Sequence, residues 1–214
     1  MSVVFEGIRK YYPKFKLPNK VLDADVREFA RTFNEPAGSM FLEVGCDTEP
    51  ICYSLAELGY NVVGIDTRGY YVPKKCKMNF AFVKGDFLKV DFKKMRFQSI
   101  AFISVLEHVG LGVYDDDPVV DGDVKAMVKT YELLNDGGHV YVTVPVGKPS
   151  CNGHWRVYNK EDLENRVIGK FKVLSTKYFA SDKIGKYSVG DYIKEENAFE
   201  SSGPEVSAML VLEK

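Results

Sequence analysis

Acidic and polar residues that could hold a nucleoside and move a proton recur directly after short apolar runs. Asp66 follows one such run, Asp86 and Phe87 follow a second, and Glu107 and His108 follow a third. An acid at such a point can accept hydrogen bonds from the two hydroxyls of a ribose. A second acid can accept from the exocyclic amine of adenine, and the neighbouring aromatic ring can cover the base. Histidine is suited to removing a proton near neutral pH.

Each of these residues also has a structural interpretation. Asp66 can cap a helix, because Asp-Thr commonly opens one. Asp86 can cap in the same way, and His108 can be hydrogen-bonded at a helix start. The ordered set favours ligand binding, because independent caps need not fall at successive strand ends.

The elements that position these residues alternate along the chain. Short β-rich runs alternate with helical patterns, which predicts parallel strands and crossover helices. Ligands of such sheets bind outside the carboxyl ends of the strands. We expect strands at 40–44, 61–65, 80–83, 98–104 and 139–144, helices at 20–33, 50–58, 121–134 and 160–167, and a closing antiparallel pair at 171–178 and 206–212.

The length of 214 residues fits a single domain. We expect an N-terminal helical segment over 1–38 and a core over 39–180. Residues 181–204 are rich in Gly, Ser and charge, and predict an insertion or lid. Residues 205–214 then form the last strand.

From about residue 39 onward, the series resembles the class I S-adenosylmethionine-dependent methyltransferases. The resemblance implies a Rossmann-like α/β fold: a mostly parallel seven-stranded sheet with helices on both faces and an antiparallel last strand. It implies S-adenosylmethionine as the cofactor. Residues 135–138 resemble the family's L-x-P-G-G turn before strand five. The cofactor-binding residues that it implies are Glu43, Gly45, Cys46, Asp66, Thr67, Asp86, Phe87, Ser104 and Val105.

A narrower likeness rests on the E-H-V-G-L-G-x-Y motif over 107–114. It resembles an uncharacterised methyltransferase-like family of unknown function. The chain departs from the broader family in its first motif, E/D-x-G-x-G-x-G, where Asp47 and Glu49 replace the second and third glycines. Two added carboxylates would repel a phosphate-bearing ligand such as NAD, whereas S-adenosylmethionine has no phosphate and carries a sulfonium cation. The G-x-G-x-x-G pattern of NAD-binding enzymes is also absent. The same change also motivates the alternative of a catalytically degenerate binding domain.

His108 is the predicted general base, with Glu107 beside it. A Glu-His pair helps to bind a divalent metal in some related methyltransferases, but those sites add a Glu three residues earlier, where this chain has Ser104. We therefore expect no metal. The predicted reaction is methyl transfer to oxygen of a small molecule or glycan.

The predicted substrate-binding residues are Tyr114, Asn152, His154, Arg156 and Tyr158. An extended loop at 152–158 aims its alternate side chains to one side. A polar surface loop is the other interpretation. The acidic run at 115–117, next to Tyr114, is either a lip of the site or a solvated face.

The overall charge is balanced, with 29 Lys and Arg against 30 Asp and Glu. This balance argues against a nucleic-acid partner, and no apolar run approaches the roughly 20 residues that span a membrane. The N-terminus lacks the pattern of a secretory signal. The four cysteines show no zinc spacing and predict reduced thiols. We expect a cytoplasmic monomer or homodimer.

Overall fold

The computed structural model describes residues 4, 6–8, 23–46, 51–69 and 79–214. Its main sheet contains β1 (Met40–Val44), β2 (Asn61–Asp66), β3 (Phe80–Lys84), β4 (Phe97–Ile103), β5 (Leu134–Pro145), β8 (Lys172–Ala180), β9 (Tyr192–Ile193) and β10 (Val206–Glu213). A separate ribbon pairs β6 (Ser150–Cys151) with β7 (Arg156–Val157). The helices are α2 (Ala24–Thr32), α3 (Ile51–Glu57), α4 (Gly122–Leu133), α5 (Lys160–Asp162) and α6 (Glu195–Ala198), with a 3₁₀ turn η2 (Leu106–His108) and a π-helical η3 (Leu163–Ile168).

The strand order is β3-β2-β1-β4-β5-β10-β8-β9. Strands β3, β2, β1, β4 and β5 pair in parallel, whereas β10, β8 and β9 each pair antiparallel with the preceding strand. The predicted Rossmann-like class I methyltransferase fold is confirmed. The predicted strand count of seven is wrong, because β9 adds an eighth strand at the edge of the sheet.

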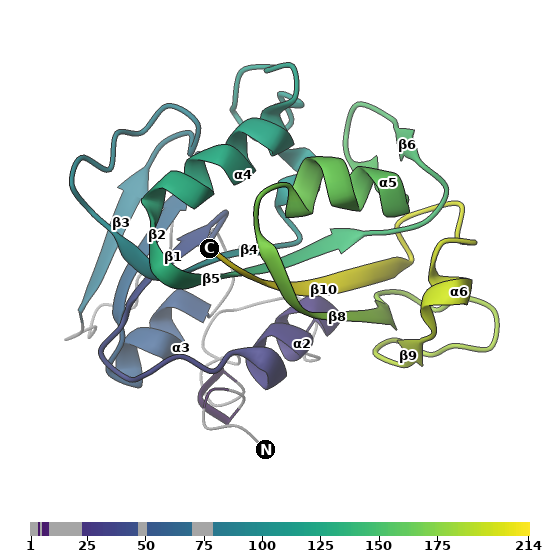
Figure 1. The fold of residues 1–214 in the computed structure, drawn as a ribbon, viewed down its shortest axis with the longest axis horizontal. Coiled ribbons are helices and arrows are strands. Elements are labelled where there is room, and N and C mark those ends of the chain that lie inside the picture. The colour runs from purple at the N-terminus through teal and green to yellow at the C-terminus, as the bar shows by residue number, and fades with distance from the viewer. Residues whose placement is uncertain (1–3, 5, 9–22, 47–50, 70–78) are drawn as a thin grey trace.

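The two faces of the sheet bury separate apolar cores. Leu42, Val63 and Ile100 belong to the core beneath α4 and η3, whereas their neighbours Phe41, Val62 and Ala101 face α2 and α3 and belong to the other. This alternation follows from the period of two along a strand. Figure 1 shows α4 and α5 on one face and α2 and α3 on the other.

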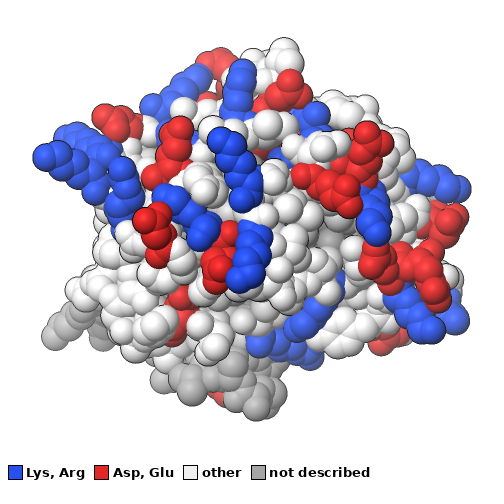
Figure 2. Space-filling view, viewed as in Figure 1, with Lys and Arg blue, Asp and Glu red and all other residues white. Residues whose placement is uncertain are grey.

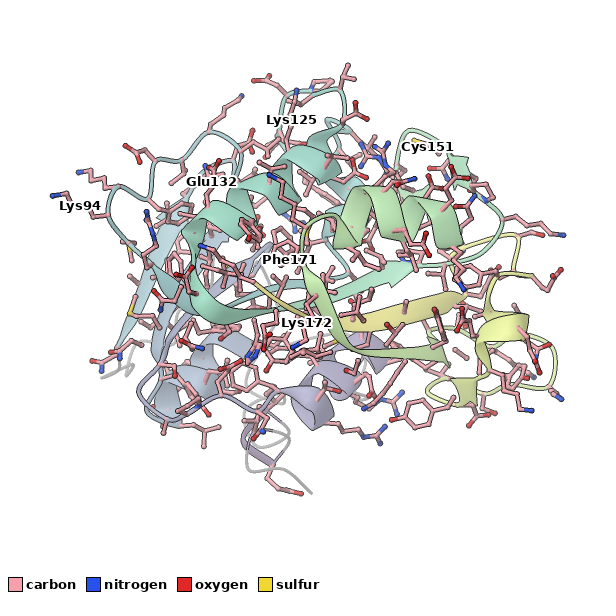
Figure 3. All side chains as sticks on the ribbon, viewed as in Figure 1. Lys94, Lys125, Glu132, Cys151, Phe171 and Lys172 are labelled. Atoms are coloured by element: carbon pink, nitrogen blue, oxygen red, sulfur yellow. The ribbon has the colours of Figure 1, made fainter. Side chains whose placement is uncertain are left out.

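Charged side chains cover the face formed by α4 and α5. Lys125 and Glu132 lie on the outer side of α4 (Figure 3), where both are exposed. Positive and negative side chains are interspersed over this face (Figure 2), as the balanced composition predicts. On the visible surface of the described residues, no broad single-sign patch forms. In the part of the chain that the structure describes, no helix combines the length and apolarity needed to cross a bilayer.

Residues 135–138 form a bulge within β5 instead of a turn before it. Phe97 pairs with Leu134 and Ser99 pairs with His139, so four residues of β5 (135–138) lie between these pairs where β4 has one, Gln98. Gly137 has a φ of 70°, a left-handed conformation that favours glycine. The predicted turn is therefore corrected: β5 begins before it, because the bulge keeps Leu134 paired with β4.

Helix α2 begins after Asp23, whose side chain accepts a hydrogen bond from the backbone of Asp25. Residues 20–22 of the predicted helix lie outside the described part of the chain, as do Asp47, Glu49 and Cys76. At the other end of the fold, segment 181–204 contributes β9 and α6, and β9 pairs with β8 at the sheet edge. Its role as an insertion or lid remains a prediction.

Candidate functional site

A cleft opens at the carboxyl ends of β1 to β4, where the strand order predicts a ligand site. Twelve of its lining residues come from the ends of these four strands and the positions just after them, and four come from the following loop. The lining residues are Val44, Gly45, Ile65, Asp66, Thr67, Arg68, Gly85, Asp86, Phe87, Ile103, Ser104, Val105, His108, Val109, Tyr114 and Asp116. Nine of the residues predicted from sequence are in this set.

Gly45 brings the end of β1 against the end of β4. Its φ is 76°, and a Cβ atom there would lie 2.4 Å from Val105 Cγ2. Both conditions require glycine. Glu43 and Cys46 do not line the cleft: the buried Glu43 accepts a hydrogen bond from the backbone of Cys52 at the start of α3 (2.9 Å), and the thiol of Cys46 packs over Gly64.

Asp66 and Asp86 place two carboxylates on neighbouring loops of the cleft. Asp66 Oδ1 accepts from the backbone of Arg68 at 2.8 Å, and Asp86 Oδ1 accepts from the backbone of Leu88 at 2.8 Å. One oxygen of each acid therefore accepts a backbone hydrogen bond within its own loop. Asp86 Oδ2 is buried and accepts no hydrogen bond from the described residues, although Lys89 Nζ lies 3.8 Å away. This orphaned acceptor is suited to a ligand N–H donor.

Ser104 turns the chain sharply at the end of β4. Its φ is 53°, and its backbone N–H donates to Thr143 Oγ1 at 2.8 Å. A left-handed conformation is uncommon for serine and is seen at functional turns. The turn leaves Ser104 exposed in the cleft and directs the following residues into η2.

Glu107 and His108 occupy η2 in different environments. Burial raises the pKa of Glu107 to about 8, and burial lowers the pKa of His108. His108 Nδ1 lies 2.6 Å from the backbone oxygen of His154, which can only accept, so Nδ1 carries the proton. His108 Nε2 therefore retains its lone pair in the neutral ring, and it lies 3.8 Å from Glu107 Oε1.

Tyr114 forms a wall of the cleft next to the residues that follow β2. The Arg68 guanidinium lies 4.7 Å from the centre of its ring, and Thr67 Oγ1 donates to its backbone oxygen. Asp116 accepts from the backbone N–H groups of Tyr114 and Gly110, both at 3.1 Å. The acidic run at 115–117 is thus divided: Asp116 holds the wall, whereas its two neighbours are exposed.

The loop after β5 folds back instead of running extended. Asn152 Oδ1 accepts from the backbones of His154 and Trp155, which creates a tight turn between β6 and β7. The side chains at 152–158 therefore do not all point to one side. The rings of His154, His108 and Tyr114 lie 5.2–5.9 Å apart, so His154 borders the cleft.

The other two predicted substrate residues of this loop lie elsewhere. Arg156 Nη1 donates to the backbone oxygens of Glu107 (3.2 Å) and Val109 (2.9 Å), which fixes η2 on both sides of His108. Tyr158 is fully buried, and its hydroxyl donates to Asp123 at 3.1 Å.

Residues 59–200 match a family described as Caenorhabditis protein of unknown function, DUF268. The chain belongs to the DUF268 family. The matched DUF268 segment includes Asp66, Asp86, Ser104 and His108, but begins after Gly45. No curated protein matches the sequence.

Solved structures of low sequence identity share the fold of this DUF268 chain. The 1,6-didemethyltoxoflavin-N1-methyltransferase of Burkholderia thailandensis has a TM-score of 0.61 and 13% identity, covering 100% of this chain and 91% of its own. NodS, an N-methyltransferase of Bradyrhizobium japonicum, has a TM-score of 0.61 and 13% identity, covering 97% and 98%. A TehB-like SAM-dependent methyltransferase of Corynebacterium glutamicum has a TM-score of 0.58 and 16% identity, covering 98% and 97%. At these identities the likeness shows the fold alone.

Two polar residues at or beside this DUF268 cleft, Arg68 and Asp25, were not predicted from the sequence. Arg68 lies two residues after Asp66 and resembles a surface residue in sequence, whereas Asp116 belongs to the acidic run that the sequence offered as a lip of the site. Asp25 lies in the first turn of an amphipathic helix, where acids are common. Among the described residues, no group of three or more His, Cys, Asp or Glu is placed to hold a metal ion.

Proposed function

We propose that this protein is an S-adenosylmethionine-dependent methyltransferase that methylates an oxygen of a small molecule or glycan. The observation that carries the proposal is the set of polar groups around one cleft at the carboxyl ends of β1 to β4. Asp66 suits the ribose hydroxyls, and the orphaned Asp86 Oδ2 suits the adenine amine. Phe87 lines the cleft beside Asp86 and suits the face of the base.

The cofactor fits the residues present. Gly45, Val105 and the exposed Ser104 line the cleft side by side, because the absence of a Cβ atom at Gly45 lets the Val105 side chain pack against it. When bound, S-adenosylmethionine supplies a methyl group that its sulfonium already activates. The residues of this chain then hold the acceptor close to that methyl group and exclude water, which provides much of the acceleration of such a reaction.

His108 is proposed to accept the acceptor's hydroxyl proton at Nε2. The hydrogen bond from Nδ1 to His154 fixes the tautomer in which Nε2 is unprotonated. Burial lowers the pKa of His108, so the ring is neutral and able to accept a proton at pH 7. Arg156 positions this histidine, because it holds the backbone on both sides of it.

The first test is calorimetric titration with S-adenosylhomocysteine, with NAD as the control. Saturable micromolar binding of the first ligand alone supports the proposal. A second candidate function is a binding domain that has lost catalysis, which Asp47 and Glu49 in the first motif favour. Absence of binding to either ligand refutes the enzyme and leaves the degenerate domain.

A further inference from the structure

Two carboxyl groups lie buried at the end of β4, next to the cleft. Asp25, in the first turn of α2, is 5% exposed, and Glu107, in η2, is 3% exposed. Asp25 Oδ1 and Glu107 Oε2 each have no hydrogen-bond partner among the described residues. An unsatisfied buried acceptor costs about 1–3 kcal/mol, so two at one place indicate a ligand that donates hydrogen bonds.

The surroundings leave the negative charge of this pair largely uncompensated. Burial is the main cause that raises the pKa of Asp25, to about 7, and Asp23 adds to it. Asp25 in turn raises the pKa of Glu107, so the two carboxyls are within electrostatic reach of each other. Arg156 lowers the pKa of Glu107, but its Nη1 already donates to two backbone oxygens. His108, which faces Glu107, is neutral at pH 7 because burial lowers its pKa.

Along the strand order, the pair lies toward β4 and β10, away from the β2 and β3 ends that carry the proposed nucleoside acids. The neighbouring side chains of Ser207 and Ser104 lower the pKa of Asp25, which places Asp25 close to both. Ser207 belongs to β10, and β10 lies beyond β5 in the strand order, whereas Asp66 and Asp86 follow β2 and β3. Asp25 and Glu107 do not line the cleft themselves, but their neighbours Ser104 and His108 do.

We infer that Asp25 and Glu107 form a subsite for a protonated amine carried by the methyl acceptor. The inference rests on the proposed function, since it assigns a feature of that function's substrate. An ammonium group brings three N–H donors and a positive charge, so it satisfies both orphaned oxygens and lets both carboxyls ionise. A hydroxyl brings one donor and no charge. An amine held here lies beside His108, the proposed base for a hydroxyl on the same acceptor.

The test is calorimetric titration with ethylammonium chloride, with sodium chloride as the ionic-strength control and ethanol as the neutral analogue. The proteins are the wild type, Asp25→Asn, Glu107→Gln and the double variant, each with and without S-adenosylhomocysteine. Asp136→Asn is the matched control, because Asp136 is fully exposed in the distant bulge of β5. We expect saturable millimolar binding of ethylammonium to the wild type and the control, and a loss of about tenfold or more in each carboxyl variant.

A second readout separates a ligand site from a structural role. Ethylammonium binding ionises the pair, so the wild type releases protons at pH 7, measured by repeating the titration in phosphate and Tris buffers. The double variant releases none. Trp155 fluorescence reports whether each variant folds, and Glu107→Gln alone decides the question if Asp25→Asn does not fold.

Three results overturn the inference. They are absence of saturable ethylammonium binding to the wild type, equal binding to the double variant, and weaker S-adenosylhomocysteine binding in Asp25→Asn with ethylammonium binding unchanged. The last result indicates that Asp25 binds the amino group of the methyl donor and not an amine of the acceptor. Failure of the wild type to bind S-adenosylhomocysteine refutes the proposed function instead, and the titrations without that ligand still decide whether the carboxyl pair binds amines.

Discussion

Replacing Glu107 with glutamine removes a titratable carboxyl group that the fold encloses almost completely. Burial raises the pKa of this group from its ordinary 4.5 to about 8. The folded protein therefore holds a proton that the unfolded chain has lost, over the whole range between these values. The favourable contribution of Glu107 to the free energy of unfolding is complete below pH 4.5 and is lost as the pH rises through 8.

The size of this effect follows from the two pKa values. Each tenfold difference in proton affinity corresponds to about 1.4 kcal/mol. Between pH 5 and pH 8, Glu107 thus lowers the free energy of unfolding of the wild type by about 3.5 kcal/mol. Glutamine does not titrate. The free energy of unfolding of Glu107→Gln therefore rises by that amount relative to the wild type between pH 5 and pH 8.

Urea denaturation at pH 5, 6, 7 and 8, followed by the fluorescence of Trp155, the single tryptophan, measures this difference. The matched control is Glu195→Gln, because Glu195 is an exposed partner of Lys160. Its unfolding free energy is expected to stay within about 0.5 kcal/mol of the wild type at every pH. If the difference between Glu107→Gln and the wild type is constant from pH 5 to pH 8, Glu107 is not held protonated and the reasoning is refuted.

The remaining predictions concern the cleft and the arginine behind it. Asp66→Ala is expected to weaken S-adenosylhomocysteine binding about tenfold or more by calorimetry, and an unchanged affinity places the ribose elsewhere. His108→Ala is expected to spare that binding and to lower kcat about 10²–10⁴-fold in a methyl-transfer assay, and undiminished turnover excludes His108 as the base. Arg156→Ala is expected to lower the free energy of unfolding by about 2–3 kcal/mol in urea denaturation, because the backbone oxygens of Glu107 and Val109 lose their donor. A loss below about 0.5 kcal/mol contradicts that role.

The parallel half of the fold was predictable from local sequence. The strands before Gly45, Asp66 and Gly85 are short apolar runs that end at polar or glycine residues, and the structure places each within one residue of the predicted bounds. Strand β9 was not predictable, because two residues, Tyr192 and Ile193, form it only by pairing with β8. Its neighbours in sequence are polar and carry no strand pattern.

The candidate site was predictable where residues follow strands. Asp66 and Asp86 line the cleft because the carboxyl ends of parallel strands meet at one edge of the sheet. The loop after β5 was different, because the side chain of Asn152 reverses the chain and separates His154 from Tyr158. Asp25 was beyond sequence reasoning, since its burial against Ser104 arises only when α2 packs on the sheet.

The hydrogen bond from Thr67 to the backbone of Tyr114 joins two adjacent walls of the cleft. One wall carries Asp66, the proposed ribose acid, and the other carries Tyr114, a predicted substrate residue, while Arg68 contacts both. A ligand that orders one wall therefore lowers the entropy cost of ordering the other. Because linkage makes such cooperativity reciprocal, we expect the proposed methyl donor and acceptor to strengthen each other's binding by the same factor. We expect a sequential kinetic mechanism, in which the second substrate binds more tightly to the binary complex than to the free protein.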